Sequence, residues 1–162
     1  MIRESSFFGN AFEQDAGLRI LAPQCCADTW FDLYEQLMDF ARSACSDPAA
    51  DPNRFYLCGV SMGGYAAWQL AMSCPELFAA VTPVCGGGMY WNASRLKDLP
   101  IWAFHGEQDA VVHVSESIRM VRAVNACGGH AKLTTYPEAG HNAWDPTFSD
   151  PEYWRWILRQ HK

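Results

Sequence analysis

The sequence predicts a single α/β domain, built as a parallel β-sheet of about five strands with helices on both faces. Apolar runs of strand length alternate along the chain with helix-length amphipathic segments, which is the pattern of a parallel sheet covered on both sides. The chain has 162 residues, of which 49% are hydrophobic, enough for one domain with a substantial core. We find no internal repeat and no low-complexity linker, so residues 1–162 are expected to form one domain.

The expected strands are short apolar runs that end at glycine, proline or polar residues. They cover residues 18–23, 54–60, 78–85, 100–105 and 131–136. The helices are expected at residues 30–45, 62–74, 114–127 and 151–160. In the first of these helices the apolar residues recur at spacings of three and four, and Gly128 and Gly129 end the third. Residues 137–146 are expected to form a loop.

Composition narrows the classes of partner. The formal net charge is -6 and the chain has no run of Lys or Arg, so nucleic acid is not an expected partner. The apolar stretches are far shorter than the roughly 20 residues of a membrane span, so no membrane association is expected. Seven cysteines without a C-x-x-C pair indicate free thiols rather than a metal site. Together with the lack of an apolar signal region in residues 1–12, they predict a cytoplasmic location, with secretion as the alternative if the natural N-terminus is longer.

One glycine-rich turn has the pattern G-x-S-x-G. It comprises Gly59, Ser61 and Gly63, with Gly64 following. An apolar strand precedes it and a helix follows, which is the context in which such a turn exposes the serine hydroxyl above a sheet. The amide of Met62 would then face the carbonyl oxygen under attack, and the helix N-terminus would favour the developing negative charge. We therefore predict that Ser61 is a nucleophile, with Met62 and Gly63 beside the substrate.

A serine hydroxyl needs a base to take its proton, and the base needs an acid to orient it. Asp109 follows the fourth predicted strand and His141 follows the fifth. Loops that leave the carboxyl ends of parallel strands meet at one edge of the sheet, where Ser61 also lies. The chain order Ser, Asp, His is the order expected for this architecture. We predict Asp109 as the acid and His141 as the base.

Other titratable residues are weaker candidates. Glu107 lies close to Asp109 in the sequence but nearer the strand, so its carboxylate is less able to reach the base. His105 is expected to be a hydrogen-bonded structural histidine at the strand end. His113 and His130 are expected to be solvated.

Five segments resemble the small α/β-hydrolase serine esterases, the phospholipase/carboxylesterase-like or predicted-peptidase branch that is related to feruloyl esterase and polyhydroxybutyrate depolymerase domains. The segments are LAPQC (21–25), GVSMGGYAAWQLA (59–71), PVCGGG (83–88), LPIWAFHGEQDAVV (99–112) and GHNAWDPTF (140–148). The resemblance implies carboxylic ester substrates, no metal and no organic cofactor. It also implies Ser61 as nucleophile, Asp109 as acid and His141 as base, with an oxyanion donor at the Met62 amide.

The sequence departs from that resemblance at its beginning. Members of the group carry additional strands before the LAPQC-like run, and a His-Gly-rich loop that supplies a second oxyanion donor. Only about 20 residues precede the run here, and they contain no His-Gly pair. We therefore expect either a minimal enzyme, in which residues 5–12 cover the site and supply a substitute donor, or a fragment whose missing start also removed any signal peptide. The missing strand would leave residues 18–23 and 54–60 to pair directly, or leave a sheet edge for a second copy of the chain to cover.

The predicted pocket is rich in large apolar side chains near the triad. Its expected walls are Trp144, Met89, Tyr90, Trp91, Phe7 and Phe8. Such side chains suit an apolar acyl or aryl group, and the chain has no room for a separate lid domain, so short-chain or aryl esters are favoured.

Three functions remain open from the sequence. The first is a serine esterase acting on small-molecule esters through a Ser-His-Asp triad and an acyl-enzyme. The second is a peptidase or thioesterase with the same triad, which substrate profiling would separate. The third is a binding module that has lost the oxyanion loop, in which Ser61 would resist labelling by a phosphonate.

Overall fold

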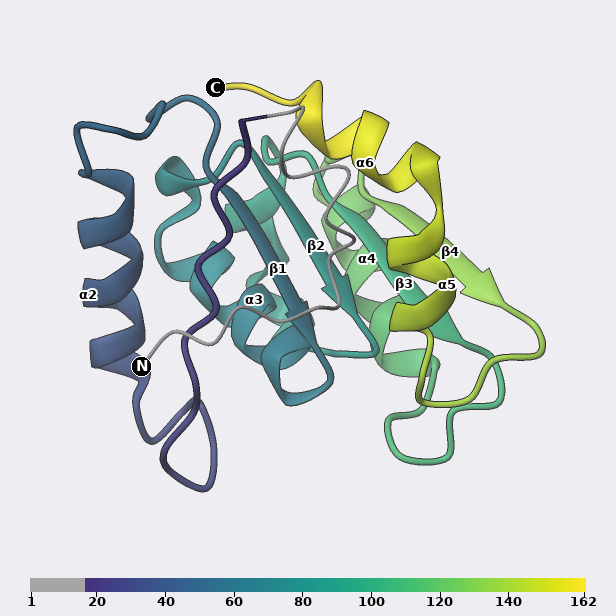
Figure 1. Cartoon of the computed structure of the whole chain (residues 1–162). Coiled ribbons are helices and arrows are strands. Elements are labelled where there is room, and N and C mark those ends of the chain that lie inside the picture. The colour runs from purple at the N-terminus through teal and green to yellow at the C-terminus, as the bar shows by residue number, and fades with distance from the viewer. Residues whose placement is uncertain (1–16) are drawn as a thin grey trace.

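The computed structural model describes residues 17–162, and its centre is a parallel sheet of four strands (Figure 1). The strands lie side by side in chain order and are β1 (Tyr56–Val60), β2 (Ala80–Val84), β3 (Trp102–Gly106) and β4 (Lys132–Tyr136). In the register of the sheet, Val60 lies opposite Val84 and Val84 opposite Phe104. All four carboxyl ends therefore lie at one edge, from which the loops that hold the predicted catalytic residues leave the sheet.

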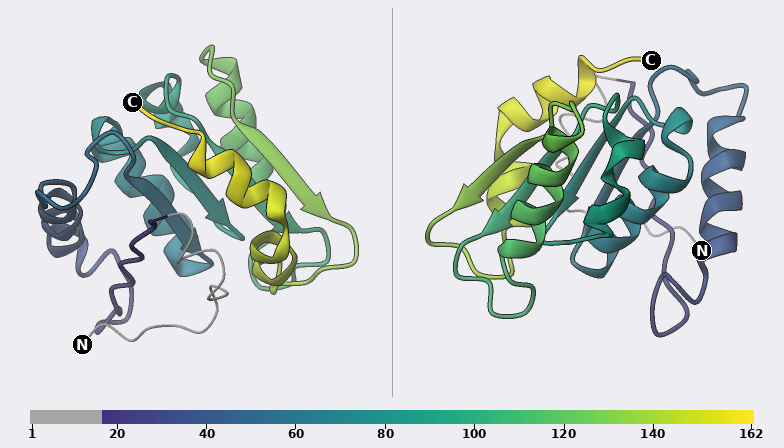
Figure 2. Two further views of the ribbon diagram at one scale, coloured as in Figure 1. Left: turned by 45° about the horizontal axis from the view of Figure 1, so that its top comes forward. Right: turned by 180° about the vertical axis from the view of Figure 1, so that it is seen from behind.

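Helices cover both faces of this sheet (Figure 2). Their bounds, with those of two 3-10 helices, are α2 (Tyr34–Cys45), α3 (Met62–Ser73), η1 (Pro75–Leu77), η2 (Tyr90–Leu96), α4 (Ser115–Ala126), α5 (Trp144–Ser149) and α6 (Pro151–Leu158). The helices α3 and α4 lie on one face, while α5 and α6 lie on the other. Within residues 17–162, every helix is too short or too polar to cross a membrane.

The α3 and α4 face encloses the larger apolar core. Trp68 of α3 and Met120 of α4 are completely buried in it, together with Leu96 of η2. Fully burying a large apolar side chain contributes about 1.5–3 kcal/mol before the opposing entropy is counted. This core fixes α3 against β1 and β2, and so fixes the turn that carries Ser61.

The α6 face is packed by aromatic rings. Trp102 of β3 meets Trp156 of α6 edge to face at 5.3 Å between ring centroids, and Phe104 meets Tyr153 at 5.7 Å. The Tyr153 hydroxyl also hydrogen-bonds Thr82 of β2 at 3.0 Å. Helix α6 begins where the sequence favours it, because the Asp150 carboxylate accepts the amide of Glu152 and proline occupies the first helical position.

The prediction of a five-stranded sheet is wrong by one strand. Residues 18–23 are extended but pair with no strand among the described residues, and β1 forms the edge of the sheet. A strand forms only where a partner accepts its backbone hydrogen bonds, and Pro23 has no amide proton to offer. Leu21 is accordingly 36% exposed rather than part of a core.

Two smaller differences lie outside the sheet. Helix α5 begins inside the predicted loop 137–146, because Pro146 falls in its first turn, where proline is tolerated. The 3-10 helix η2 has no counterpart among the predicted elements. The predicted role of residues 5–12, including Phe7 and Phe8, lies outside the described residues.

Candidate active site

Ser61 occupies a strained turn between β1 and α3. Its backbone angles are φ 55° and ψ −118°, a region that residues with a side chain rarely adopt. The Ser61 amide donates to the carbonyl of Val84 at 2.9 Å, which holds the turn against the end of β2. Such strain costs of order 1–3 kcal/mol and persists where surrounding contacts impose it, as at functional sites.

The glycines around Ser61 are required by close packing. A Cβ on Gly59 would overlap the carbonyl oxygen of Gly63, and a Cβ on Gly64 would lie 2.7 Å from the carbonyl oxygen of Val84. Strand and helix therefore approach more closely than any other residue type would allow. This close approach lets the chain reverse at Ser61 and present its side chain at the sheet edge.

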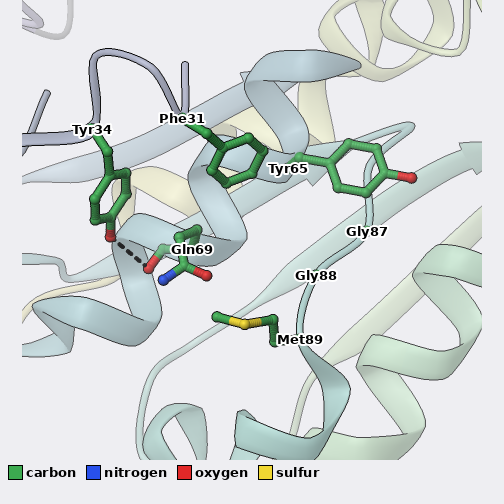
Figure 3. Close-up of a pocket in the computed structure, with 7 residues that line it drawn as sticks. All are labelled: Phe31, Tyr34, Tyr65, Gln69, Gly87, Gly88 and Met89. Carbon is green, nitrogen blue, oxygen red and sulfur yellow. Dashed lines mark hydrogen bonds between the residues drawn. The ribbon is translucent and has the colours of Figure 1, made fainter. Parts of the chain in front are cut away.

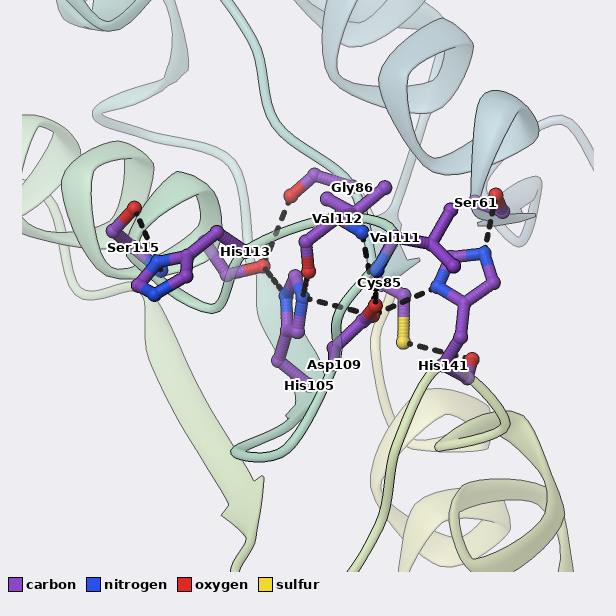
Figure 4. Close-up of polar contacts among 11 residues, drawn as sticks. Ser61, Cys85, Gly86, His105, Asp109, Val111, Val112, His113, Ser115 and His141 are labelled. Atoms are coloured by element: carbon purple, nitrogen blue, oxygen red, sulfur yellow. Dashed lines mark hydrogen bonds and ion pairs between the residues drawn. The ribbon is translucent and has the colours of Figure 1, made fainter.

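The structure brings Ser61, His141 and Asp109 into one hydrogen-bonded chain (Figure 4). The Ser61 Oγ lies 2.7 Å from His141 Nε2, and His141 Nδ1 lies 2.7 Å from Asp109 Oδ2. Asp109 is in the loop after β3, and His141 is in the loop after β4. With the carboxylate accepting from Nδ1–H, the unprotonated Nε2 faces the serine hydroxyl, which is the arrangement that lets an imidazole act as a base.

The Asp109 carboxylate is buried and accepts several hydrogen bonds. Its Oδ1 accepts the amides of Val111 and Val112, both at 2.9 Å. Burial acts to raise the pKa of Asp109, but hydrogen bonds from His141 and from these two amides outweigh it and lower the pKa below its ordinary value. Asp109 therefore remains ionised at neutral pH and can stabilise a positive charge on His141.

The start of α3 carries Met62, the predicted oxyanion donor. Met62 is the first residue of the helix, so no carbonyl of the helix can accept its amide proton. A Cβ on Gly63 would meet only the indole nitrogen of Trp30, at 4.0 Å. This places the Trp30 indole beside the first turn of α3. Trp30 was not among the predicted site residues, because the sequence gives no sign that it lies close to this turn.

Of the aromatic residues predicted to line the pocket, Trp144 contacts the triad. Its ring lies edge to face against His141, with 5.6 Å between centroids, and it begins α5. Tyr90 begins η2 and is 45% exposed, and the ring contact that the structure gives it is with Trp91. Trp144 therefore supports the imidazole, whereas Tyr90 has no described contact with the triad.

An apolar pocket lies between α2, α3 and the glycine loop that follows β2 (Figure 3). Its volume is about 440 Å³, and it is lined by Phe31, Tyr34, Tyr65, Gln69, Gly87, Gly88 and Met89. Tyr65 is one helical turn from Ser61, whose carbonyl accepts the Tyr65 amide at 3.1 Å. Met89 was a predicted wall residue. The aromatic lining residues were not predicted, because their clustering depends on how α2 packs on α3.

Cys85 lies behind the triad, at the end of β2. Burial raises the pKa of its thiol to about 11, so the thiol stays protonated at neutral pH. Its Sγ donates to the carbonyl of His141 at 3.4 Å, which ties the His141 loop to the sheet.

One group of side chains among residues 17–162 has the spacing of metal ligands. It comprises Cys85, His105 and Asp109, whose ligand atoms all lie within 4.8 Å of one another. The Cys85 thiol and both Asp109 oxygens are already engaged in hydrogen bonds within the protein. The chemistry of this cluster is therefore that of a hydrogen-bonded network rather than of a set of free metal ligands.

The weaker candidates have other partners. Glu107 accepts a hydrogen bond from Thr135 at 2.7 Å, away from the imidazole of His141. His113 is exposed and bonds Ser115, and His130 is exposed. His105 is completely buried and hydrogen-bonded at both ring nitrogens, as expected of a structural histidine.

The fold and the Ser-His-Asp geometry together define a hydrolase of the α/β class, and sequence comparison gives the family. The dienelactone hydrolase family matches residues 22–149, which is most of the chain. The protein belongs to this family.

Two of the individual relatives are named as esterases. Feruloyl esterase B of Piromyces equi is 31% identical over 105 residues, which is 60% of this chain but only 19% of that protein. The crystal structure of a thermostable esterase superposes with a TM-score of 0.76 at 36% identity, covering 81% of this chain and 37% of the other. The structure of Arabidopsis thaliana SOBER1 shares the fold, with a TM-score of 0.66 at 16% identity over 80% of this chain and 62% of that one. The chain thus spans well under half of the first two relatives.

Proposed function

We propose that the protein is a serine hydrolase that cleaves carboxylic esters with short or aromatic groups, through an acyl-enzyme on Ser61. The observation that carries the proposal is the hydrogen-bonded chain from Ser61 through His141 to Asp109, with 2.7 Å at each link. The esterase relatives support the same reaction class.

The reaction begins with attack of the Ser61 Oγ on the ester carbonyl carbon while His141 Nε2 takes the hydroxyl proton. Asp109 stabilises the imidazolium through the bond to Nδ1. The carbonyl oxygen becomes an oxyanion that accepts the amide of Met62, beside the positive end of α3. Collapse of this intermediate breaks the bond to the alkoxide, which takes the proton from His141. A water molecule then releases the acid by the same steps.

The pocket supports the choice of substrate. It is lined mainly by aromatic and apolar side chains, begins one helical turn from Ser61, and its volume is sufficient for an aryl or short acyl group. The name of the Piromyces equi relative, feruloyl esterase B, agrees with an aromatic substrate. A thioester or peptide would use the same triad, so a panel of ester, thioester and amide substrates decides the leaving group.

The test is hydrolysis of p-nitrophenyl acetate and p-nitrophenyl butyrate by the wild type and by Ser61→Ala. We expect the variant to lose at least about 10³-fold in kcat/KM, because no other group replaces the nucleophile. Ser43→Ala is the matched control, since Ser43 is exposed on α2, and it should keep wild-type rates. A folded wild type that is as inactive as Ser61→Ala would instead indicate a binding module.

A further inference from the structure

The indole nitrogen of Trp30 lies beside the first turn of α3, next to the turn that carries Ser61. Apart from α3 itself, the one described atom within 4 Å of a Cβ on Gly63 is Trp30 Nε1, at 4.0 Å. Because Nε1 is the nearest atom of the ring, the N–H edge of the indole faces this turn. The Cα–Cβ bonds of an α-helix tilt toward its N-terminus, so the space at Gly63 lies on the side where the free amide of Met62 projects.

Hydrogen bonds fix the Trp30 segment relative to α3. The Asp32 carboxylate accepts the amide and the hydroxyl of Thr29, at 2.8 Å and 2.7 Å, and so closes the turn that contains Trp30. The chain then enters α2, where the Tyr34 hydroxyl donates to the carbonyl of Gln69 in α3 at 3.1 Å. These contacts are made within the protein, so the indole is already in place before a substrate binds.

The Trp30 indole N–H is a donor without an acceptor in the described part of the chain. An indole nitrogen can only donate, and Trp102, by comparison, donates to Thr134 Oγ1 at 2.9 Å. Trp30 is half-buried, and the next residue, Phe31, lines the apolar pocket (Figure 3). Two consecutive residues beside the start of α3 thus supply an unused donor and a wall of the pocket.

We propose that Trp30 is a catalytic residue whose indole N–H, together with the amide of Met62, donates to the substrate carbonyl oxygen as it becomes an oxyanion. The proposal rests on the proposed function, because this oxyanion forms only when Ser61 attacks an acyl group. Hydrolases of this architecture use two donors, the amide after the nucleophile and an N–H from another segment. In this protein the second donor is the side chain of Trp30, whose proton stays on its nitrogen throughout.

This role predicts a particular kinetic pattern. The carbonyl oxygen carries more negative charge in the transition state than in the bound ester, so the hydrogen bond from Trp30 is strongest in the transition state. Its removal should lower kcat and kcat/KM together and leave KM nearly unchanged. A residue that only packed against the ester would change KM instead.

The kinetic test compares Trp30→Phe with the wild type on p-nitrophenyl butyrate, since phenylalanine keeps an aromatic ring and removes the N–H. We expect kcat to fall by about 10²-fold with KM little changed, as for the loss of one oxyanion donor. Trp156→Phe is the matched control, the same change in α6 on the other face of the sheet, and it should keep wild-type rates. Wild-type kcat in folded Trp30→Phe, or a loss confined to KM, would overturn the proposal and leave the esterase assignment intact.

Binding of phenylboronic acid gives a readout that does not depend on turnover. The Ser61 Oγ adds to boron while its proton passes to His141, and the tetrahedral boronate places an oxygen where the oxyanion forms. By isothermal titration calorimetry, the dissociation constant should rise in Trp30→Phe by about the factor by which kcat/KM falls. Unchanged affinity in this variant would overturn the proposal.

The hydrogen bond itself is tested by NMR of the indole N–H groups. The Trp30 signal, assigned from its loss in Trp30→Phe, should move downfield when the boronate binds the wild type and stay in place in Ser61→Ala. An unmoved Trp30 signal in the boronate-bound wild type would overturn the proposal alone. A wild type that neither hydrolyses esters nor binds the boronate would overturn the proposed function as well.

Discussion

A histidine lies on each side of the Asp109 carboxylate, and the two histidines differ in burial and in their second partner. On the open side, His141 lies 2.7 Å from Oδ2, its side chain is 23% exposed, and its far nitrogen reaches Ser61. On the buried side, His105 is fully enclosed, and its far nitrogen reaches Ser117 rather than solvent. The comparison teaches that burial and the partner of the second nitrogen, not the contact with the carboxylate, distinguish the histidine that we propose as the base.

The largest expected effect is on the open side. His141→Gln should lower kcat/KM for p-nitrophenyl acetate by at least about 10⁴-fold, because it removes the base that hydrogen-bonds the Ser61 hydroxyl. His113→Gln should retain wild-type activity. The urea midpoint of His141→Gln should stay close to that of the wild type, since His141 is partly exposed. Activity retained in His141→Gln would exclude this histidine as the base.

Asp109 contacts both histidines, so its substitution should affect both catalysis and stability. Asp109→Asn should lower kcat by about 10³-fold or more, because the amide no longer favours the correct tautomer of His141 or stabilises its charge. It should also lower the urea midpoint, since the amides of Val111 and Val112 and the His105 ring lose an ionised acceptor. Asp98→Asn, at a side chain that is 85% exposed, serves as the control for both measurements. Equal midpoints for the two variants would contradict the role of Asp109 on the buried side.

The smallest expected effect is the dependence of stability on acid. The pKa of Asp109 is lower in the folded protein than its ordinary value, so its stabilising contribution is fully present above about pH 4, the unfolded value. This contribution is lost as the pH falls through the folded pKa. The difference in unfolding free energy between the wild type and Asp109→Asn should therefore narrow on acidification below pH 4. A difference that widens there would show that the folded pKa is raised instead.

The sequence was sufficient to predict that Ser61, Asp109 and His141 lie together, because their placement follows from chain order alone. Ser61, Asp109 and His141 each follow a strand of a parallel sheet, and that rule brings them to one edge without knowledge of the packing. The starts of α3 and α6 were also predictable, because they depend on neighbouring residues. A glycine turn precedes α3, and Asp150 and a proline begin α6.

Features that depend on packing between distant segments were not predictable. Residues 18–23 have the composition of a strand, yet whether they pair depends on which strand lies beside them. The approach of Trp30 to Gly63 and the aromatic pocket on α3 depend on the packing of the segment before α2. The sequence identified His105 as structural, but its contact with Asp109 depends on how the loop after β3 folds back.

The most direct test of the central claim is the reaction of the protein with a fluorophosphonate, followed by intact-mass and peptide mass spectrometry. The account predicts a single adduct on Ser61, formed as its Oγ attacks phosphorus and fluoride leaves, and strongly slowed in His141→Gln. Absence of an adduct on the folded wild type, or an adduct on another serine that forms equally fast in Ser61→Ala, would contradict the assignment of Ser61 as an activated nucleophile.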